Sequence, residues 1–299
     1  MPLTQLRGLV KTMRPQQWIP KNIIVFAALV LSGTILAFQL EPILRVIAAF
    51  VLFALISSCA YILNDLLDIE KDRAHPTKRN RPLPSGQLSI GTAWVALGIF
   101  LAIALVSAYL LNPLFALIVA LYFVNNILYS TTIKNVVILD VFSIAAGFVL
   151  RALGGAIILS VPISPWLYIL TGLFSLFLGI SKRRHEVHLL QEGSGAFRKV
   201  LNEYSKPMLE EMLNVVTSST VIAYSIYTFT AENLPSNHAM MLTIPFVVYG
   251  IFRYLYLVHS GQDAPPDEML LKDRPLIITV MLWGISVLLI LYGFSDRVG

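Results

Sequence analysis

Long apolar segments follow one another along almost the whole chain and are separated by short polar connections. Apolar segments of about 17 to 25 residues can cross the hydrocarbon core of a bilayer as helices. The pattern therefore predicts an all-α, polytopic membrane protein with nine transmembrane helices. The predicted ranges are 19–37, 43–66, 90–110, 113–130, 136–159, 165–182, 209–230, 240–259 and 275–294.

The composition agrees with this interpretation, because 57% of the 299 residues are hydrophobic and only 13% are charged. The mean hydropathy of +0.74 lies well above that of ordinary soluble domains. The single cysteine, Cys59, lies in an apolar run and cannot form an internal disulfide, so we expect it to pack in the core. We expect no cleavable signal peptide, because cations such as Arg7 and Lys11 interrupt the first segment.

Lysine and arginine are concentrated in the connections after the second, fourth, sixth and eighth predicted helices, and the other connections between helices hold none. Because cytoplasmic loops are enriched in these residues, we expect a cytoplasmic N-terminus and a C-terminus on the outside. The net charge of +5 suits a protein that meets anionic lipid or an anionic substrate. We expect one membrane domain over residues 1–299, located in the cell membrane, with its polar site on the cytoplasmic face.

The most polar stretch follows the second predicted helix. Tyr61, Asn64, Asp68 and Asp72 recur at spacings of three and four residues, so a continued helix would place them on one face, with Asp65 rotated by about 100°. That face offers oxygen ligands for a hard cation. A solvated helix with internal ion pairs explains the pattern less well, because acids at the end of a hydrophobic helix are costly and usually functional.

A turn-rich loop should follow these acids, because His75-Pro76 disfavours further helix and Arg81-Pro82 opens a run of turn residues. Lys78 and Arg81 would lie on this loop and could fold over a ligand.

A smaller polar cluster precedes the first predicted helix. We expect Trp18 to anchor at the membrane interface and Arg14 to meet lipid headgroups. Lys21 lies about one turn into the helix, and the sequence leaves open whether it extends to the interface or turns toward the other helices.

A second polar concentration lies after the fourth predicted helix. Lys134 alone would be an ordinary cytoplasmic lysine, but Asp140 and Arg151 lie progressively deeper in the next apolar segment. These two are about three helical turns apart, too far to pair, so each needs a partner on another helix or a ligand. Three glycines should allow close helix packing here: Gly147, Gly154 and Gly155.

A third polar concentration follows the sixth predicted helix, where Lys182, Arg183 and Arg184 precede Glu186. Such a run is a topology signal or a contact with lipid headgroups, and it is equally what a phosphate clamp would need. The sequence does not decide between these interpretations.

Together, one carboxylate-rich and two cation-rich loops on one membrane face describe a pocket for a magnesium-bound diphosphate and a second anion. Mg²⁺ is typically held by one or two protein carboxylates and by substrate phosphate oxygens, and it stabilises pyrophosphate as a leaving group. The sequence contains no glycine-rich phosphate loop, no Ser-His-Asp or Cys-His constellation and no nucleic-acid motif, so we expect no nucleic-acid partner.

These residues resemble the UbiA superfamily of intramembrane prenyltransferases, which are all-helical and magnesium-dependent. The likeness starts from Asn64-Asp65-x-x-Asp68-x-x-x-Asp72, which is similar to the first aspartate-rich motif of that superfamily. Agreement with one branch, the decaprenyl-phosphate phosphoribosyltransferases, covers nearly the full chain. It comprises Asp72-Arg73-x-His75-Pro76-x-Lys78-x-x-Arg81-Pro82, Tyr129-Ser130, Asp140-Val141, Gly147-Phe148-x-x-Arg151, Ser181-Lys182-Arg183-Arg184, Arg253-Tyr254-x-Tyr256 and Leu271-x-Asp273-Arg274-Pro275.

The resemblance implies transfer of 5-phosphoribose from phosphoribosyl diphosphate (PRPP) to decaprenyl phosphate or another polyprenyl phosphate, with release of pyrophosphate, for the synthesis of cell-envelope glycan precursors. It assigns the catalytic magnesium ligands as Asn64, Asp68 and Asp72. It assigns the PRPP-binding residues as Lys21, Tyr61, Lys78 and Arg81. It assigns the residues for the polyprenyl phosphate as Lys134, Lys182 and Arg183.

One departure from the superfamily concerns its second Asp-x-x-x-Asp motif, because Asp140 is followed four residues later by Ile144 and Lys134 lies at the loop. We therefore expect no second full magnesium cluster, and an anionic acceptor in place of a neutral aromatic ring.

Two other functions remain alternatives. One is a conventional prenyltransferase that moves a prenyl group onto an aromatic acceptor, and the other is a transporter or lipid-binding protein. The sequence leaves open the length of the acceptor chain and whether the protein forms a homo-oligomer.

Overall fold

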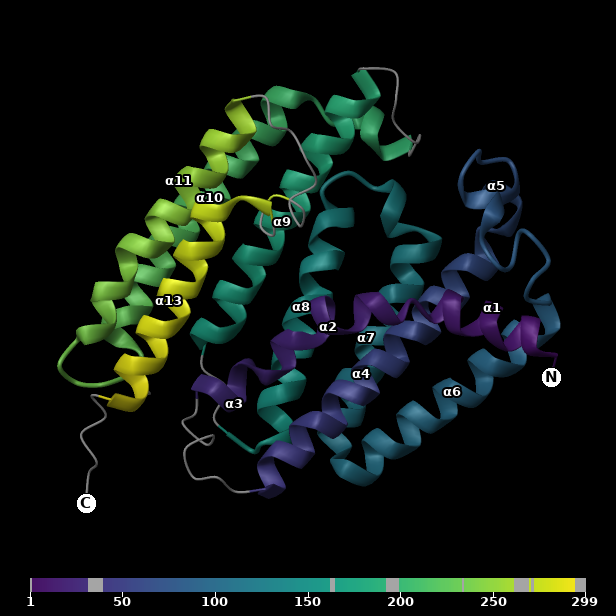
Figure 1. Cartoon of the computed structure of the whole chain (residues 1–299), viewed down its shortest axis with the longest axis horizontal. Helices are drawn as coiled ribbons and strands as arrows, with labels where there is room; N and C mark the ends of the chain where they lie inside the picture. The colour runs from purple at the N-terminus through teal and green to yellow at the C-terminus, as the bar shows by residue number, and fades with distance from the viewer. Residues whose placement is uncertain are drawn as a thin grey trace. The chain divides into compact units, whose positions relative to one another are not determined.

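The computed structural model describes residues 2–31, 40–161, 165–191, 199–232, 234–260, 269 and 272–293 (Figure 1). These ranges contain helices and no strand, which confirms the all-α prediction. The chain forms two compact units. The first comprises Met1–Val30, Phe38–Lys134 and Ala146–Ile163, and the second comprises Leu31–Ala37, Asn135–Ala145 and Ser164–Gly299.

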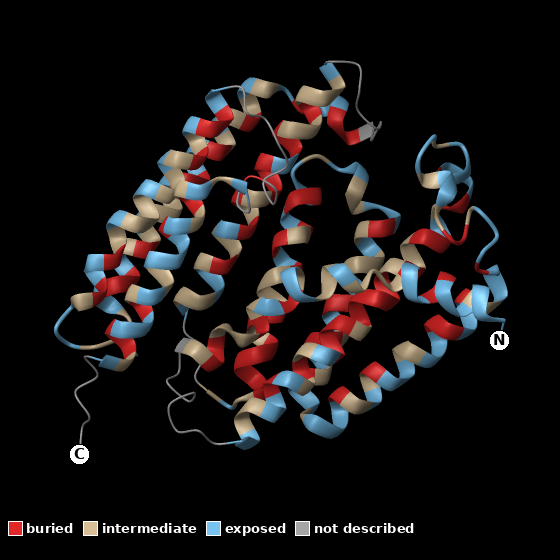
Figure 2. Cartoon of the chain, in the orientation of Figure 1, coloured by how far each residue is buried: buried red, intermediate tan, exposed pale blue. Residues whose placement is uncertain are grey.

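In the first unit several helices pack against α4, Leu40–Leu67, which is the longest of the described helices. This helix is mostly apolar between Val46 and Ile62, and it is most buried from Leu52 to Ala60, whereas Ile47 and Val51 are 42% and 55% exposed. Buried residues accordingly follow one another along its middle (Figure 2). Its neighbours are α1 (Leu3–Met13), α2 (Trp18–Asn22), α6 (Ile90–Leu111) and α7 (Pro113–Thr131).

Local capping signals fix where α6 and α7 begin. The Ser89 hydroxyl accepts a hydrogen bond from the Thr92 amide at 3.1 Å, and the Asn112 side chain accepts from the amides of Leu114 at 2.8 Å and Phe115 at 3.1 Å. These bonds satisfy amides that have no partner within the helix. Because Asn112 both ends α6 and caps α7, the two helices form a tight hairpin.

The second unit is built mainly from four long helices, in which α9 packs along α10, α10 contacts α11, and α11 packs on α13. Their bounds are Pro165–Gln191, Lys206–Thr230, Ile244–His259 and Arg274–Gly293. A hydrogen-bonded relay joins three elements of this unit. Trp283 donates to the Tyr224 hydroxyl at 2.7 Å, and Tyr224 shares a 2.6 Å bond with Thr243.

Seven of the described helices are long and apolar enough to cross a membrane, and they match seven of the nine predicted ranges. The predicted helix at 209–230 exists as α10, but its many serine and threonine side chains make it less apolar. The predicted helix at 19–37 is instead broken into short pieces. These are α2, a 3₁₀ turn at Ile23–Phe26 and α3 at Ala27–Leu31, while residues 32–37 lie outside the described ranges.

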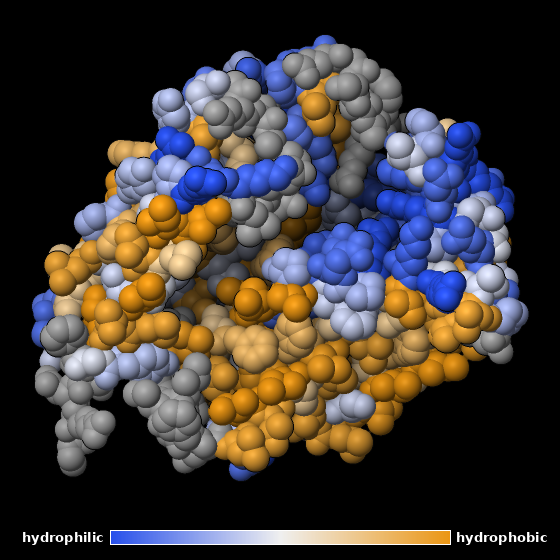
Figure 3. All heavy atoms as spheres, in the orientation of Figure 1, coloured by the Kyte–Doolittle hydropathy of each residue, from blue (hydrophilic) through white to orange (hydrophobic). Residues whose placement is uncertain are grey.

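Large apolar side chains on α6 point outward, and this helix appears mostly orange in Figure 3. Val95, Ile99 and Leu110 are 63%, 53% and 79% exposed. A continuous apolar surface of this kind is stable against lipid tails and unfavourable against water. The chain is a multi-pass membrane protein, as its sequence predicts.

Two of the three glycines predicted to allow close packing of α8, Leu139–Ile158, do so in its part that belongs to the first unit, whereas a Cβ at Gly147 would make only ordinary contacts, the nearest at 3.5 Å. A Cβ atom added at Gly154 would lie 2.6 Å from the Phe53 ring, and one at Gly155 would lie 2.0 Å from the Val25 carbonyl oxygen. Neither position has room for a larger residue. The backbones of α8 and the N-terminal segment therefore approach as closely as glycine permits.

We predict that Gly155→Ala lowers the thermal unfolding temperature of the purified protein, because the added methyl group collides with backbone and cannot be accommodated by a rotamer change. Overpacking of this kind typically costs about 1–3 kcal/mol. Gly98→Ala is the matched control, since a Cβ there meets nothing within 4 Å and alanine favours helix. Equal unfolding temperatures for the two variants would contradict the close approach.

Candidate active site

The predicted polar face lies where α4 ends and the short helix α5, Ile69–Arg73, begins. Asp68 separates the two helices, yet its amide bonds the Asn64 carbonyl at 3.0 Å and the Asp72 amide bonds the Asp68 carbonyl at 2.8 Å. These bonds keep the spacing of one helical turn across the break. The backbone spacing that the sequence predicts for Asn64, Asp68 and Asp72 is therefore kept, but the Asp72 carboxylate shares Arg81 with Asp65 while Asp68 contacts Lys134.

Asp68 binds a cation of the protein. The Lys134 ammonium donates to both carboxylate oxygens of Asp68, at 3.0 and 2.9 Å, and both side chains are 17% exposed. Lys134 lies on the short turn Ile133–Asn135 after α7, and Lys71 lies further from the same carboxylate at 3.6 Å. The sequence predicted both residues for the site but did not predict their contact.

Two further acids of this region, Asp65 and Asp72, are buried and paired with arginines. Arg81 contacts Asp72 at 2.7 Å and Asp65 at 3.2 Å, and Arg14 contacts Asp65 at 2.7 Å. Arg81 lies on the turn-rich loop after α5, as predicted, and it ties this loop to α4. The expectation that Arg14 meets lipid headgroups is wrong, because its guanidinium binds a protein carboxylate.

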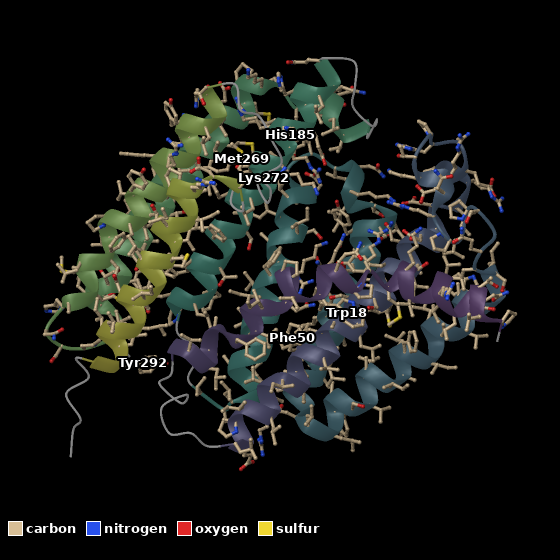
Figure 4. The ribbon with its side chains drawn as sticks, in the orientation of Figure 1. Trp18, Phe50, His185, Met269, Lys272 and Tyr292 are labelled. Carbon is tan, nitrogen blue, oxygen red and sulfur yellow. The ribbon has the colours of Figure 1, made fainter. Side chains whose placement is uncertain are left out.

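The sequence left open whether Lys21 extends to the membrane interface or turns toward the other helices. In the structure it turns toward the other helices. Its ammonium donates to the Tyr61 hydroxyl at 3.0 Å and to Gln17 at 2.8 Å, and it lies 5.1 Å from the centre of the Tyr61 ring. The nearby Trp18, labelled in Figure 4, donates to the Met13 carbonyl at 3.2 Å and to the Ser58 hydroxyl at 3.0 Å. The N-terminal segment is thus held against α4 by side-chain hydrogen bonds.

Arg151 has partners on other helices, as predicted from its depth in the apolar segment. Its Nε donates to Asn22 at 2.7 Å, its Nη1 to the Gly147 carbonyl at 3.0 Å, and its Nη2 to Tyr122 at 2.6 Å and Ser57 at 3.4 Å. The sequence interpretation missed Asn22, Ser57 and Tyr122. Ser57 could have been found, because it lies four residues before Tyr61 and continues the same face of α4.

The remaining predicted residues lie in three different settings. Lys78 is half-buried on the loop after α5, where it begins the 3₁₀ turn Lys78–Asn80. Lys182 is exposed on α9 in the second unit, whereas Arg183 is 1% exposed and donates to Asp140 at 2.6 Å. Arg183 also pairs with Glu186. This buried ion pair accounts for the position of Arg183 without a ligand, in place of the predicted contact with a lipid phosphate.

Asp140 is fully buried, and its second partner is Tyr204, whose hydroxyl donates at 2.6 Å and accepts from the Ile138 amide at 2.7 Å. Burial raises the pKa of Tyr204, and its hydrogen bond to Asp140 raises it further. The phenol therefore stays protonated and donates to the carboxylate. The prediction that Asp140 finds a partner on another helix is confirmed, and its carboxylate is occupied by Arg183 and Tyr204.

The residues of the first unit fit a magnesium ion by their donor chemistry. No three His, Cys, Asp or Glu side chains form a ready-made cage in the described ranges. Mg²⁺ does not need such a cage, because it usually takes one or two carboxylates and completes its shell with water and substrate phosphate. The Asp68 carboxylate already binds the positively charged Lys134 side chain, and the side chain of the half-buried Asn64 makes no hydrogen bond to another described residue.

The sequence and the fold were both compared with known proteins, and the matches point to one family. Residues 24–272 match the model of the UbiA prenyltransferase family. The chain is 30% identical to the decaprenyl-phosphate phosphoribosyltransferase of Mycobacterium tuberculosis, over 96% of this chain and 95% of that protein. It is 32% identical to the enzyme of the same name from Mycolicibacterium smegmatis, over 94% and 92%. A UbiA homologue from Archaeoglobus fulgidus bound to DMAPP and Mg²⁺ has the same fold, with a TM-score of 0.68 at 19% identity over 95% of this chain and 99% of that one.

We predict that Asp65→Asn destabilises the protein, because Arg14 loses its anionic partner and Arg81 loses one of two. Breaking a largely buried pair costs about 3–5 kcal/mol when both groups are buried, and we expect about 1–3 kcal/mol here because both arginines are partly exposed. Glu70→Gln is the matched control, since its pair with Arg73 is exposed on the same segment. Thermal unfolding in detergent measures both variants, and an Asp65→Asn protein as stable as the control would exclude the structural role of this carboxylate.

Proposed function

Because the chain belongs to the UbiA prenyltransferase family, we propose that it transfers 5-phosphoribose from PRPP to decaprenyl phosphate or a related polyprenyl phosphate, releasing pyrophosphate. The near full-length relatives named decaprenyl-phosphate phosphoribosyltransferase support this substrate pair. The structural observation that carries the proposal is the contact of Lys134 with both oxygens of Asp68.

This contact favours an anionic acceptor. A lysine beside the carboxylate that is proposed to bind the metal forms no ion pair with a neutral aromatic ring, whereas it can bind the phosphate of a lipid. Asp68 cannot hold Lys134 and a magnesium-bound diphosphate in the same way at once. Binding of the donor complex would therefore release the Lys134 ammonium, which then becomes available to the acceptor phosphate.

The roles of the other residues follow from their chemistry. We assign Asn64, Asp68 and Asp72 to Mg²⁺, which when bound neutralises the negative charge on the departing pyrophosphate. The donor's phosphates and ribose are assigned to residues that carry N–H or O–H donors around this face. These are Lys21, Tyr61, Lys78 and Arg81.

In the proposed reaction an oxygen of the lipid phosphate forms a bond to C1 of the ribose while the bond from C1 to pyrophosphate breaks. The lipid phosphate needs no strong general base, because the second pKa of a phosphate monoester is about 6. The protein then acts mainly by holding two anions in position. Lys134 and the exposed Lys182 are assigned to the lipid phosphate, and Arg183 acts through its ion pair with Asp140 to hold α9.

We further propose that the chain is a single membrane domain with nine transmembrane helices, a cytoplasmic N-terminus and an active site on the cytoplasmic face. The basic connections around Arg81, Lys134 and Lys182 support this orientation. It also suits the substrates, because PRPP is water-soluble while the lipid phosphate reaches the same face from the bilayer. The product would serve cell-envelope glycan synthesis.

We predict that purified protein with Mg²⁺, labelled PRPP and decaprenyl phosphate forms a labelled lipid and equimolar pyrophosphate. Chelation with EDTA should reduce product to background, and added Mg²⁺ should restore it. Asp68→Asn should lower kcat at least about a hundredfold, because the leaving group loses its stabilisation. Formation of only a prenylated aromatic product from a prenyl diphosphate would instead establish the conventional prenyltransferase, and substrate movement without pyrophosphate release would establish a transporter.

We predict that Lys134→Ala raises the apparent KM for decaprenyl phosphate more than the KM for PRPP, by about tenfold or more, because a charge-assisted hydrogen bond to the acceptor is lost. Lys71→Ala is the matched control, since this lysine also lies near Asp68 but is 76% exposed in its side chain. A larger effect of Lys134→Ala on the KM for PRPP would move Lys134 to the donor site.

A further inference from the structure

Two cations of the first unit, the buried Arg151 and the half-buried Lys21, have only neutral partners among the described residues. Arg151 is 4% exposed, and its four hydrogen bonds go to an amide oxygen, a backbone carbonyl and two hydroxyl groups. Lys21 binds a phenol and an amide. Burying a cation without a nearby anion costs free energy. Such cations therefore usually bind an anionic ligand.

The two cations are neighbours in the structure. Tyr61 and Ser57, which hold Lys21 and Arg151 respectively, lie one turn apart on α4, and that spacing brings side chains to about 6 Å of one another. Asn22, which follows Lys21 in sequence, accepts the hydrogen bond from the Arg151 Nε at 2.7 Å. The ammonium and the guanidinium thus belong to one cluster beside α4.

The carboxylates at the end of α4 are already paired with other cations of this unit. Asp65, Asp68 and Asp72 are each paired with at least one of the three cations Arg14, Arg81 and Lys134. The Lys21–Arg151 pair then carries two positive charges with no described carboxylate in contact. A phosphate monoester carries about −1.5 to −2 charges at pH 7, so a single such group would neutralise the pair.

We propose that Lys21 and Arg151 form a binding site for a phosphate monoester, deeper along α4 than the proposed magnesium ligands. Tyr61, which binds Lys21, lies three residues before Asn64, and Ser57, which binds Arg151, lies seven residues before it, about 4.5 and 10 Å along the helix. The site therefore begins beside the magnesium ligands at Lys21 and extends deeper at Arg151. The site rests on the proposed function for the identity of its ligand, because a phosphate monoester is present in both substrates. It is the 5-phosphate of the ribose donor or the phosphate of the lipid.

Binding measurements test the site without turnover. Ribose 5-phosphate represents the donor and farnesyl phosphate the acceptor, and the readout is the rise in unfolding temperature of detergent-solubilised protein as each probe is titrated. We expect a rise for the wild type with at least one probe. Arg151→Met and Lys21→Met should weaken that binding about tenfold or more, because each removes one of the two charges.

A structural role for Arg151 makes a different prediction. If the guanidinium serves only to link helices, Arg151→Met lowers the unfolding temperature without ligand while the rise on adding the probe persists. Lys21→Met keeps all four hydrogen bonds of Arg151 and so tests the site even if the first variant folds poorly. Arg253→Met is the matched control, because Arg253 is paired with Asp273 at 2.8 Å in the second unit and should leave phosphate binding unchanged.

The outcomes distinguish the two possible sources of the phosphate, and they also separate this site from the proposed function. Loss of the rise for ribose 5-phosphate alone assigns the site to the donor, loss for farnesyl phosphate alone assigns it to the lipid, and loss for both means that the site accepts either. The inference is overturned if neither probe stabilises the wild type, or if both variants respond like the wild type. A protein that binds through Arg151 but forms no phosphoribosylated lipid would overturn the proposed function and leave the site standing.

Discussion

The need to neutralise charge in apolar surroundings governs the structure of the first unit. The middle of α4 is largely buried, and at its acidic end Asp65, Asp68 and Asp72 each contact a cation from another part of the chain. An unpaired carboxylate at that position would cost several kcal/mol in lost hydration. These ion pairs therefore attach the N-terminal segment, the loop after α5 and the turn after α7 to the same end of α4.

The sequence predicts what depends on spacing along one helix and fails where contacts are long-range. The one-turn spacing of Asn64, Asp68 and Asp72 and the turn-rich loop follow from helical period and proline positions, and both are present in the structure. The contact of Arg14 with Asp65 joins residues 51 positions apart, and that of Lys134 with Asp68 joins residues 66 apart. No local pattern specifies which cation folds back onto which acid.

Burial is the second property that the local pattern did not reveal. In the run from Lys182 to Arg184, one cation is exposed and two are buried in ion pairs, although the sequence presents them as equivalent. The first predicted helix shows a related difficulty, because hydropathy predicts a continuous helix through Asn22. The side chain of Asn22 instead bonds the Trp18 carbonyl at 2.9 Å and accepts from Arg151, and the helix changes to a 3₁₀ turn at the next residue.

The pairing of Lys134 with Asp68 affects how bulk phospholipids compete with the polyprenyl phosphate for Lys134. Phospholipid headgroups vastly outnumber any polyprenyl phosphate, and an unengaged lysine at the membrane surface would attract them. In the structure the ammonium and the carboxylate form a locally neutral unit, which offers little attraction to bulk anionic lipid. If binding of the donor complex separates Lys134 from Asp68, the lysine can attract a lipid phosphate only when the donor is already bound.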